Sequence, residues 1–317
     1  MVKRLIIDTD TAGDDTISIL LALKWPGVKV DAITIVEGNV EFEQEVENAL
    51  YTVERFASYH VPVYPGCRRP LLKTWRYADY VHGKDGMGEN YFPKARQRPE
   101  EKHGVQALIE LVNSSPGEYT IIAQGPLTNI ATAIMLDKEF AKNIGRLYIM
   151  GGYADGFGNI TPAAEYNFWV DPDAAKIVLH SGVRPLLVGW DIALKYSVVT
   201  EEEHRMIAGW GTSEADFFVK VNRKVLEYEK RVTGVAGSTH PDTITTAIAI
   251  EPRVAKRVEP RFVDVENVSE LTRGMSVVDH LGVLGKPANA DVCYEADGEL
   301  FKKMLFSVLK GRPGEMD

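Results

Sequence analysis

Short, continuously apolar runs alternate with longer segments of helical periodicity over roughly the first two thirds of this 317-residue chain. The runs have the length of strands, and examples are RLIIDTD at 4–10, YTIIAQG at 119–125 and RLYIMGG at 146–152. Between them, apolar residues recur every three or four positions, as in DDTISILLALK at 14–24. Strands that are apolar at nearly every position belong in a sheet covered on both faces, and strand–helix alternation indicates parallel pairing. The sequence therefore predicts an α/β fold with an open, doubly wound, mostly parallel sheet.

The pattern becomes helical after about residue 200. Helical segments are expected at 200–210, 214–232 and 240–252, followed by short strand-like pieces and a last helix at 298–311. No linker rich in Pro, Gly or Ser separates this part, so we expect a single domain spanning 1–317, with the late helices covering the sheet. The polar stretch at 66–104 lacks periodicity, and loops of that length are usually functional lids or disordered.

Composition excludes several functional classes. No apolar run approaches the roughly 20 residues of a membrane helix, and the opening MVKRLIIDTD contains no signal-peptide core, so a cytoplasmic protein without a membrane partner is expected. Two cysteines, Cys67 and Cys293, are too few for a disulfide scaffold. The net charge of −9, without a basic run, argues against a nucleic-acid partner.

Four carboxylates, those of Asp8, Asp10, Asp14 and Asp15, lie within eight residues at the end of the first predicted strand. Charges of one sign placed this close repel each other unless a cation or a proton intervenes. One aspartate, or two, can be explained as a cap of the following helix, but four cannot. The cluster therefore predicts a site for positive charge.

The other predicted strands also end in polar or functional side chains: Glu37, Asn39, Gln124, Met150 and Asp191. In open parallel sheets, ligands bind at the carboxyl ends of the strands. Oxygen ligands in this number suit Ca²⁺ or Mg²⁺ rather than zinc, because no Cys/His cluster has ligand spacing. A divalent-cation site at this edge of the sheet is the expected arrangement.

Two families begin with such a strand. The segment IIDTDT at 6–11 resembles the start of haloacid-dehalogenase-type phosphatases, which implies a Mg²⁺-dependent phosphohydrolase with Asp8 as nucleophile and Asp10 as acid/base. The lysine and the later acidic pair that this family also requires have no clear counterparts here.

The longer segment DTDTAGDD at 8–15 resembles the signature of inosine–uridine-type nucleoside hydrolases. The similarity continues in order along most of the chain, through EGN at 37–39, HGKDGMG at 82–88, GPLTNIA at 125–131, MGGY at 150–153, AEYNFWVDPDAA at 164–175 and VGWDIALKY at 188–196. Each stretch alone is a weak indication, but seven in the same order are strong evidence.

This resemblance implies a Rossmann-like nucleoside hydrolase fold and hydrolysis of the N-glycosidic bond of purine or pyrimidine ribonucleosides to free base and ribose. It implies Ca²⁺ held by Asp10, Asp15, Asp242 and the backbone carbonyl of Gln124, with Asp10 as general base toward the metal-activated water that attacks C1′. It further implies ribose contacts from Asp14, Asn39, Met150, Asn159, Glu165 and Asn167. A homodimer or homotetramer is expected, as is a role in nucleoside salvage.

One stretch departs from the family pattern. The members of the family that accept both purine and pyrimidine nucleosides carry His-Asp late in the chain, whereas Pro241 here separates His240 from Asp242. Proline cannot donate a proton, although it suits the first turn of a helix. Contacts to the leaving base are therefore possible from His82, Tyr228 or His240, and the proton can come from one of these or from solvent. A nucleoside-binding protein without turnover is the non-enzymatic alternative, and the base preference stays open.

Overall fold

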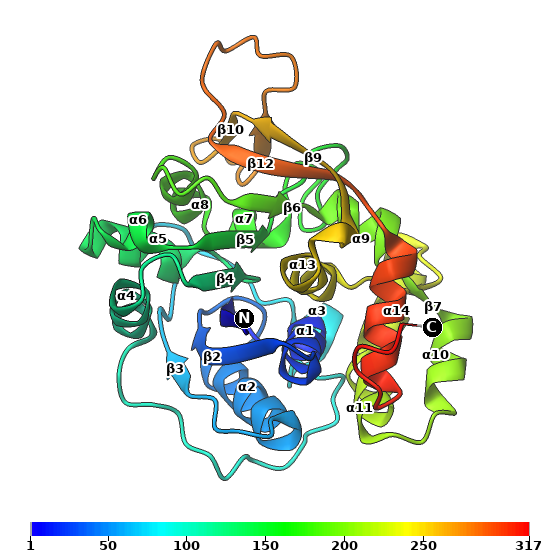
Figure 1. The fold of residues 1–317 in the computed structure, drawn as a ribbon. Helices are drawn as coiled ribbons and strands as arrows, with labels where there is room; N and C mark the ends of the chain where they lie inside the picture. Colours follow the sequence, from blue (N-terminus) through cyan, green and yellow to red (C-terminus); the bar gives the residue numbers. More distant parts are fainter. Residues whose placement is uncertain (1, 317) are drawn as a thin grey trace.

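The computed structural model describes residues 2–316, and a twisted eight-stranded sheet runs through its centre (Figure 1). From one edge to the other, its strands are β3 (Val63–Pro65), β2 (Val28–Ile35), β1 (Lys3–Thr9), β4 (Tyr119–Ala123), β5 (Arg146–Met150), β6 (Leu186–Val188), β12 (Ala290–Ala296) and β9 (Ala255–Arg261). Neighbouring strands are parallel from β3 to β12, and only the edge strand β9 runs antiparallel to its neighbour. The order 3-2-1-4-5-6 is that of a doubly wound sheet, which confirms the predicted fold class.

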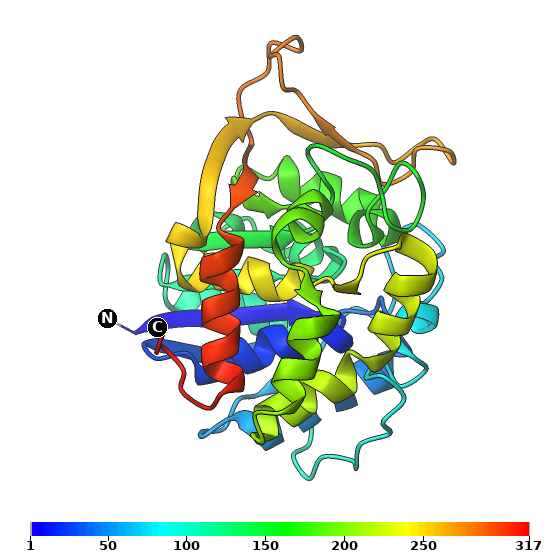
Figure 2. The ribbon, with the colours of Figure 1, turned by 90° about the vertical axis from the view of Figure 1, so that its right-hand side faces the viewer.

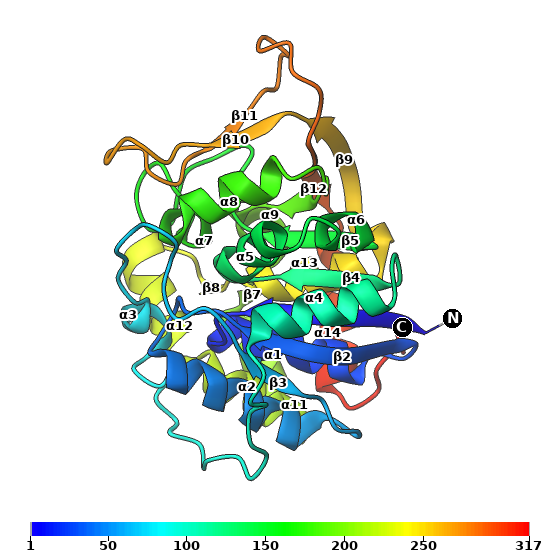
Figure 3. The same cartoon turned by 90° about the vertical axis from the view of Figure 1, so that its left-hand side faces the viewer.

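Helices cover both faces of the sheet. One face carries α4 (Gly104–Ser114), α5 (Thr128–Leu136), α6 (Phe140–Asn143) and α8 (Pro172–Leu179) (Figure 3). The other carries α1 (Gly13–Lys24), α2 (Phe42–Phe56), α9 (Trp190–Tyr196), α13 (Pro241–Ile250) and α14 (Gly298–Leu309). Outside this layer lie α10 (Glu201–Ala208) and α11 (Ser213–Val221), and Figure 2 shows α14 crossing in front of β1 and α1.

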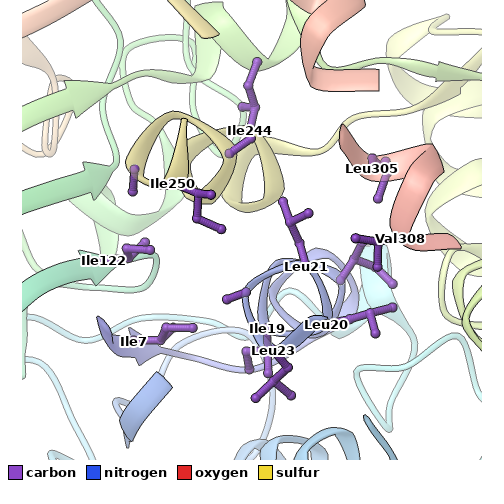
Figure 4. Close-up of a cluster of buried hydrophobic side chains, with 14 of the residues drawn as sticks. Ile7, Ile19, Leu20, Leu21, Leu23, Ile122, Ile244, Ile250, Leu305 and Val308 are labelled. Carbon is purple, nitrogen blue, oxygen red and sulfur yellow. The ribbon is translucent and has the colours of Figure 1, made fainter. Parts of the chain in front are cut away.

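The apolar strands explain why both faces need a helical layer. Leu5 and Ile7 of β1 belong to the core beneath α1, α2 and α13, whereas Ile6 belongs to the core beneath α4, α5 and α8, and all three side chains are fully buried. Successive strand residues point to opposite faces, so a strand that is apolar throughout must be covered twice. Figure 4 shows Ile7 and Ile122 of neighbouring strands facing side chains of α1 and α13.

The C-terminal third differs from the expectation in one helix. The segment 214–232, predicted as continuous, divides at Asn222 into α11 and α12 (Arg223–Tyr228), and a π-helical turn η1 (Glu229–Thr233) follows. The Asn222 side chain donates to the Phe218 carbonyl (2.9 Å), and such a local bond competes with regular helix geometry. By contrast, α13 begins at Pro241, as the first-turn preference of proline predicts.

Two short helices lie near the carboxyl ends of β5 and β6. The apolar run RPLLVGWD at 184–191 predicts a strand, but this strand ends at Val188, and Trp190 and Asp191 begin α9. Residues 166–170 form the short helix α7 (Tyr166–Val170), because Glu165 caps its amides. Within 66–104, the only helix of the described structure is α3 (Asp79–His82), in agreement with the predicted loop. None of the helices in residues 2–316 combines the length and the apolar character needed to cross a membrane.

The sheet order reverses at β1, whose neighbours are β2 and β4. Chain segments that leave such adjacent strands in opposite directions open a crevice at their carboxyl ends, which is where open α/β sheets bind ligands. Figure 3 shows α3, α7 and α12 gathered at that end, opposite the N-terminus. The acidic segment 8–15 therefore begins at the topological switch point.

Candidate active site

A cavity of about 450 Å³ lies at the carboxyl ends of the strands. Its wall combines residues that follow β1, β2, β4 and β5 with residues of α3, α7, α9, α12, η1 and the start of α13. Most of the predicted site residues line it: Asp14, Asp15, Asn39, His82, Gln124, Met150, Asn159, Glu165, Asn167, Tyr228 and Asp242. Two do not, since Asp10 and His240 are fully buried behind the wall.

The Asp10 carboxylate is buried without a hydrogen-bond partner for either oxygen among the described residues. Two glycines pack directly against it, because a Cβ at Gly38 would stand 2.1 Å from Asp10 Oδ2 and one at Gly125 would stand 2.9 Å from Asp10 Oδ1. Asn39 Nδ2 donates to the Asp10 backbone carbonyl (3.1 Å). These contacts explain why the EGN and GPLTNIA stretches carry glycine where they approach Asp10.

The Asp15 carboxylate is held by the ends of β1 and β4. Its Oδ1 accepts from Thr9 Oγ1 (2.6 Å) and Gln124 Nε2 (3.2 Å), and its Oδ2 accepts from the Ala12 amide (3.1 Å). Burial raises the pKa of Asp15 to about 7, although these hydrogen bonds oppose the shift. The Gln124 side chain is thus turned toward Asp15, and its backbone carbonyl accepts from Asn167 Nδ2 (3.4 Å).

Asp14 joins the start of α1 to the start of α13. Its Oδ2 accepts from the amides of Asp242 (2.7 Å) and Thr243 (3.1 Å). Its Oδ1 accepts from Thr243 Oγ1 and from His240 Nδ1, both at 2.6 Å. Pro241 has no amide hydrogen to offer at the first position. Asp14 therefore acts as the N-cap of a helix far from it in sequence and brings Asp242 to the acidic cluster.

The carboxylates gathered here destabilise one another in their ionised forms. Burial, followed by the charges of Asp15, Asp14 and Asp10, raises the pKa of Asp242 well above its usual range. Burial, followed by Asp15 and Glu45, does the same for the pKa of Asp10. A positive charge among them would favour the ionised forms.

The donor set fits a hard divalent cation. Both oxygens of Asp10 and Oδ1 of Asp242 are buried without a hydrogen-bond partner in the described part of the chain, and carboxylate and carbonyl oxygens are the ligands of Ca²⁺ and Mg²⁺. Within residues 2–316, no three His, Cys, Asp or Glu side chains stand close enough together to form a metal centre as placed. The Asp15 oxygens are instead engaged by protein donors.

Glu165 and Asn167 link the ends of β4 and β5. Glu165 caps α7, with Oε1 accepting from the Asn167 amide (2.8 Å) and Oε2 accepting from the amides of Gly152 (2.8 Å) and Phe168 (3.2 Å). Burial raises the pKa of Glu165 to about 7. Asn167 Nδ2 donates to the Met150 carbonyl (3.2 Å). This side of the cavity therefore carries polar groups that are fixed at the ends of two strands, β4 and β5.

The opposite end of the cavity is aromatic. Tyr80 of α3 meets Tyr228 of α12 edge to face, with ring centroids 5.7 Å apart. His82 lies beside them with Nδ1 unpartnered within the described residues, and burial lowers its pKa to about 4, so its ring is neutral near pH 7. Flat aromatic surfaces of this kind suit a nucleobase or another planar group.

The Asp8 carboxylate lies outside the cavity wall and is held by hydrogen bonds from protein side chains. Asp8 is fully buried, and its Oδ1 accepts from Thr34 Oγ1 (2.5 Å) and Asn129 Nδ2 (2.8 Å). Burial raises the pKa of Asp8 to about 6. A side chain enclosed in this way is poorly placed for the nucleophile that the phosphohydrolase hypothesis requires.

Glu45 of α2 is a site-related residue that the sequence reasoning missed. Its Oε1 accepts from the amides of Gly38 (3.0 Å) and Val40 (3.1 Å), so it shapes the loop that packs on Asp10. Helical spacing offered a signal, because Glu45 stands three residues after Phe42 and one before Val46, on the buried face of its helix. A charged residue on an apolar stripe is a candidate for a specific role.

Comparisons with known proteins agree on one family. The family model described as inosine-uridine preferring nucleoside hydrolase matches residues 5–303. The pyrimidine-specific ribonucleoside hydrolase RihB of Escherichia coli (strain SE11) is 32% identical over 309 residues, which cover 98% of this chain and 97% of that protein. Among solved structures, the plant nucleoside hydrolase PpNRh1 is similar with a TM-score of 0.92 at 30% identity, covering 98% of this chain and 99% of that chain. The purine-preferring ribonucleoside hydrolase from Gardnerella vaginalis has a TM-score of 0.91 at 28% identity, with the same coverage. These comparisons give no support to the phosphohydrolase alternative.

The burial of Asp8 predicts a specific pH dependence of stability. Its folded pKa of about 6 exceeds the unfolded value of about 4, so the folded state binds the extra proton between these values and the free energy of unfolding falls as pH rises through this window. The Asp8→Asn variant lacks this contribution. The free energy of unfolding is measured by urea denaturation without added metal. The value for the variant minus that for the wild type should increase by up to about 3 kcal/mol between pH 4 and pH 6, and this difference should stay constant above pH 6. A constant difference across this range would contradict the assignment.

Proposed function

Since this chain belongs to the inosine-uridine preferring nucleoside hydrolase family, we propose that it hydrolyses ribonucleosides to free base and ribose with Ca²⁺ as its metal and Asp10 as general base. It is a hydrolase of N-glycosyl bonds. The observation that carries the finer proposal is the set of buried, unpartnered oxygens on Asp10 and Asp242 beside a cavity with polar groups at one end and aromatic rings at the other.

The proposed metal ligands are Asp10, Asp15, Asp242 and the Gln124 backbone carbonyl. The Asp14 bridge supports this set, because it holds the start of α13 against the start of α1. When bound there, Ca²⁺ would lower the pKa of a coordinated water and offset the repulsion among the carboxylates. A hard cation matches a donor set made only of oxygens.

We assign the proton of the attacking water to Asp10. A carboxylate whose pKa is raised by burial is a stronger base than one in water, and a general base works best when its pKa lies near the operating pH. The contacts of Gly38 and Gly125 restrict the Asp10 side chain, and this fixes the direction in which it accepts a proton. Proton transfer to a positioned base contributes about 10²–10⁴-fold to a rate.

The polar end of the cavity is the proposed ribose site. Side chains that bind sugar hydroxyls there are Asp14, Asn39, Asn159, Glu165 and Asn167, with Met150 packing against the ring. Cleavage of a glycosidic bond passes through a cationic, oxocarbenium-like transition state. Carboxylates fixed around C1′ stabilise that positive charge more than they stabilise the neutral substrate.

The aromatic end is the proposed base site. Of the three candidate contacts to the leaving base, His82 and Tyr228 line the cavity, whereas His240 lies behind the wall. Burial raises the pKa of Tyr228, so its hydroxyl keeps its proton near neutral pH and can donate to a departing base. We therefore prefer Tyr228 or a solvent molecule over His240 as the proton donor.

Self-association into a homodimer or homotetramer is supported by an exposed apolar arm. Between β11 (Ser276–Val278) and β12, the side chains of Leu281, Val283 and Leu284 are 87%, 79% and 51% exposed. Several large apolar side chains grouped on one exposed loop are typical of interaction surfaces. The loop that carries them projects from the top of the molecule in Figure 1.

A nucleoside panel tests the reaction and the metal together. Inosine, adenosine, uridine and cytidine are incubated with the protein, and free ribose is measured by a reducing-sugar assay. Ribose release should be lost after treatment with a chelator and restored by Ca²⁺, because the proposed ligands hold a hard cation. The order of rates defines the base preference, for which the relatives offer both a pyrimidine-specific and a purine-preferring example. Undiminished release after complete metal removal would contradict the metal assignment.

Replacement of the proposed base gives a second test. Asp10→Asn keeps the size of the side chain and removes its basicity, so kcat should fall by at least 100-fold while bound calcium, measured by elemental analysis, stays near the wild-type ratio. The control is Asp216→Asn on α11, whose side chain is half exposed and pairs with Lys220 on the same helix. A tenfold or smaller loss in Asp10→Asn would argue against the assignment of the base.

The charge of the cavity predicts discrimination against nucleotides. Among the described residues of its wall there is no Lys or Arg, whereas Asp14, Asp15, Glu165, Glu229 and Asp242 are present. A nucleoside 5′-monophosphate brings two negative charges into this field, and like charges in such a site cost several kcal/mol. We expect kcat/KM for uridine or inosine 5′-monophosphate to be at least 100-fold below that of the nucleoside, measured by base release. Comparable values would show that another group receives the phosphate.

A further inference from the structure

Behind Asp14, two buried histidines pack against one phenylalanine. The ring of Phe218 stacks against both His204 (centroids 5.0 Å apart) and His240 (5.2 Å). The hydroxyl of Ser238 joins the two, since its Oγ lies 2.8 Å from His204 Nε2 and 2.7 Å from His240 Nε2. His240 Nδ1 in turn lies 2.6 Å from Asp14 Oδ1. A continuous hydrogen-bonded chain thus runs from α10 to the proposed ribose site.

The partners determine where the protons lie. An ionised carboxylate only accepts, so His240 Nδ1 carries the hydrogen that binds Asp14. When His240 carries its ring hydrogen on Nδ1 alone, its Nε2 accepts the single hydroxyl hydrogen of Ser238. Ser238 Oγ accepts from His204 Nε2–H, which leaves His204 Nδ1 as a bare acceptor, and that atom has no partner within the described residues. This arrangement satisfies every hydrogen bond of the chain.

We propose that His240, oriented by Ser238, is a positioning residue that fixes the Asp14 carboxylate for the sugar and, through Asp14, the first turn of α13 with Asp242. This inference rests on the proposed function, which places Asp14 on the ribose. His240 touches no substrate in this role. Pro241 between His240 and Asp242 has a structural reason here. It allows His240 to bind one oxygen of Asp14, Oδ1, while the next two backbone amides donate to the other oxygen, Oδ2.

His240 contributes what the other partners of Asp14 cannot. Asp14 Oδ1 has two donors, His240 Nδ1 and Thr243 Oγ1. The threonine hydroxyl hydrogen rotates, and its oxygen also lies 3.5 Å from the Asp14 carbonyl. The imidazole is fully buried, stacked on Phe218 and held at its far nitrogen, so its N–H has one direction. Small displacements of positioning groups lower the reaction rate by large factors, because reacting groups must be aligned within fractions of an ångström.

Substitutions at His240 separate positioning from bulk. His240→Ala removes the donor to Asp14, and we expect kcat/KM for the best nucleoside of the panel to fall about 100-fold. His240→Asn places an amide N–H near the position of Nδ1, and it should recover at least tenfold of that loss. Rescue by a smaller, non-aromatic side chain that keeps the donor is not expected if the histidine only fills space. Equal activity of the two variants would overturn the inference.

Substitution at Ser238 tests the far end of the chain with a minimal change. Ser238→Ala deletes one buried oxygen, and kcat/KM should fall about tenfold because His240 Nε2 loses its donor. The matched control is Ser307→Ala on α14, which deletes an equally buried hydroxyl that binds the carbonyl of Met304 within its own helix. Circular dichroism verifies folding of each variant. Wild-type kcat/KM in Ser238→Ala would overturn the inference.

A spectroscopic measurement tests the proton arrangement without turnover. In protein labelled with ¹⁵N-histidine, His240 Nδ1–H should give a slowly exchanging, downfield ring-proton resonance, assigned by its loss in His240→Asn. The resonance should persist in Ser307→Ala and disappear or broaden in Ser238→Ala. A proton on Nε2 of His240 instead of Nδ1 would overturn this inference alone. Wild-type protein that releases no ribose from any nucleoside would overturn the proposed function, and with it the catalytic part of the inference.

Discussion

The contact between the Asp14 carboxylate and the first turn of α13 is the interaction on which the site depends. It joins residues 228 positions apart and satisfies two amides that a helix start would otherwise leave without partners. Because α1 and α13 both begin here, the partial positive charges of two helix N-termini face the same group of carboxylates. The bridge fixes the position of Asp242 relative to Asp10 and Asp15.

The acidic cluster lowers the stability of the folded chain and supplies the carboxylates that the proposed reaction requires. Buried carboxylates with raised pKa values destabilise the folded chain at neutral pH, and Asp8, Asp15 and Glu165 all have this property. Proteins accept such local costs at functional sites and offset them through the rest of the fold. Here the offset comes from two apolar cores, one on each face of the sheet, which are built from fully buried strand residues.

Sequence patterns predicted those parts of the structure that local interactions determine. The apolar runs indicated the doubly wound sheet, and Pro241 begins α13 in accordance with its preference for a first turn. Most of the predicted site residues line one cavity, because strands that are parallel deliver their ends to the same edge. The roles of the individual site residues stay proposals.

Other features depend on contacts between distant segments and had no local signature. Asp14 was expected at the sugar, and its four hydrogen bonds to the region of α13 were not foreseeable from its own neighbours. His240 was a candidate contact of the leaving base, yet its buried ring stacks on Phe218 of α11 and is bonded to Ser238 of β8 (Gly237–Ser238). Glu165 was expected at the ribose, and its capping of α7 shows only in three dimensions.

The position of the bridging residues along the chain has a consequence for biosynthesis. Strands β1 to β6 lie within residues 3–188 and are therefore synthesised first. The partners of Asp14 are the amides of residues 242 and 243, and β12, at 290–296, is added to the sheet later still. A nascent chain that has not reached α13 exposes its acidic strand end without the helix that completes it. A chain that terminates before α13 therefore lacks part of the cavity wall, and the cavity is completed only after residues 242 and 243 have left the exit tunnel.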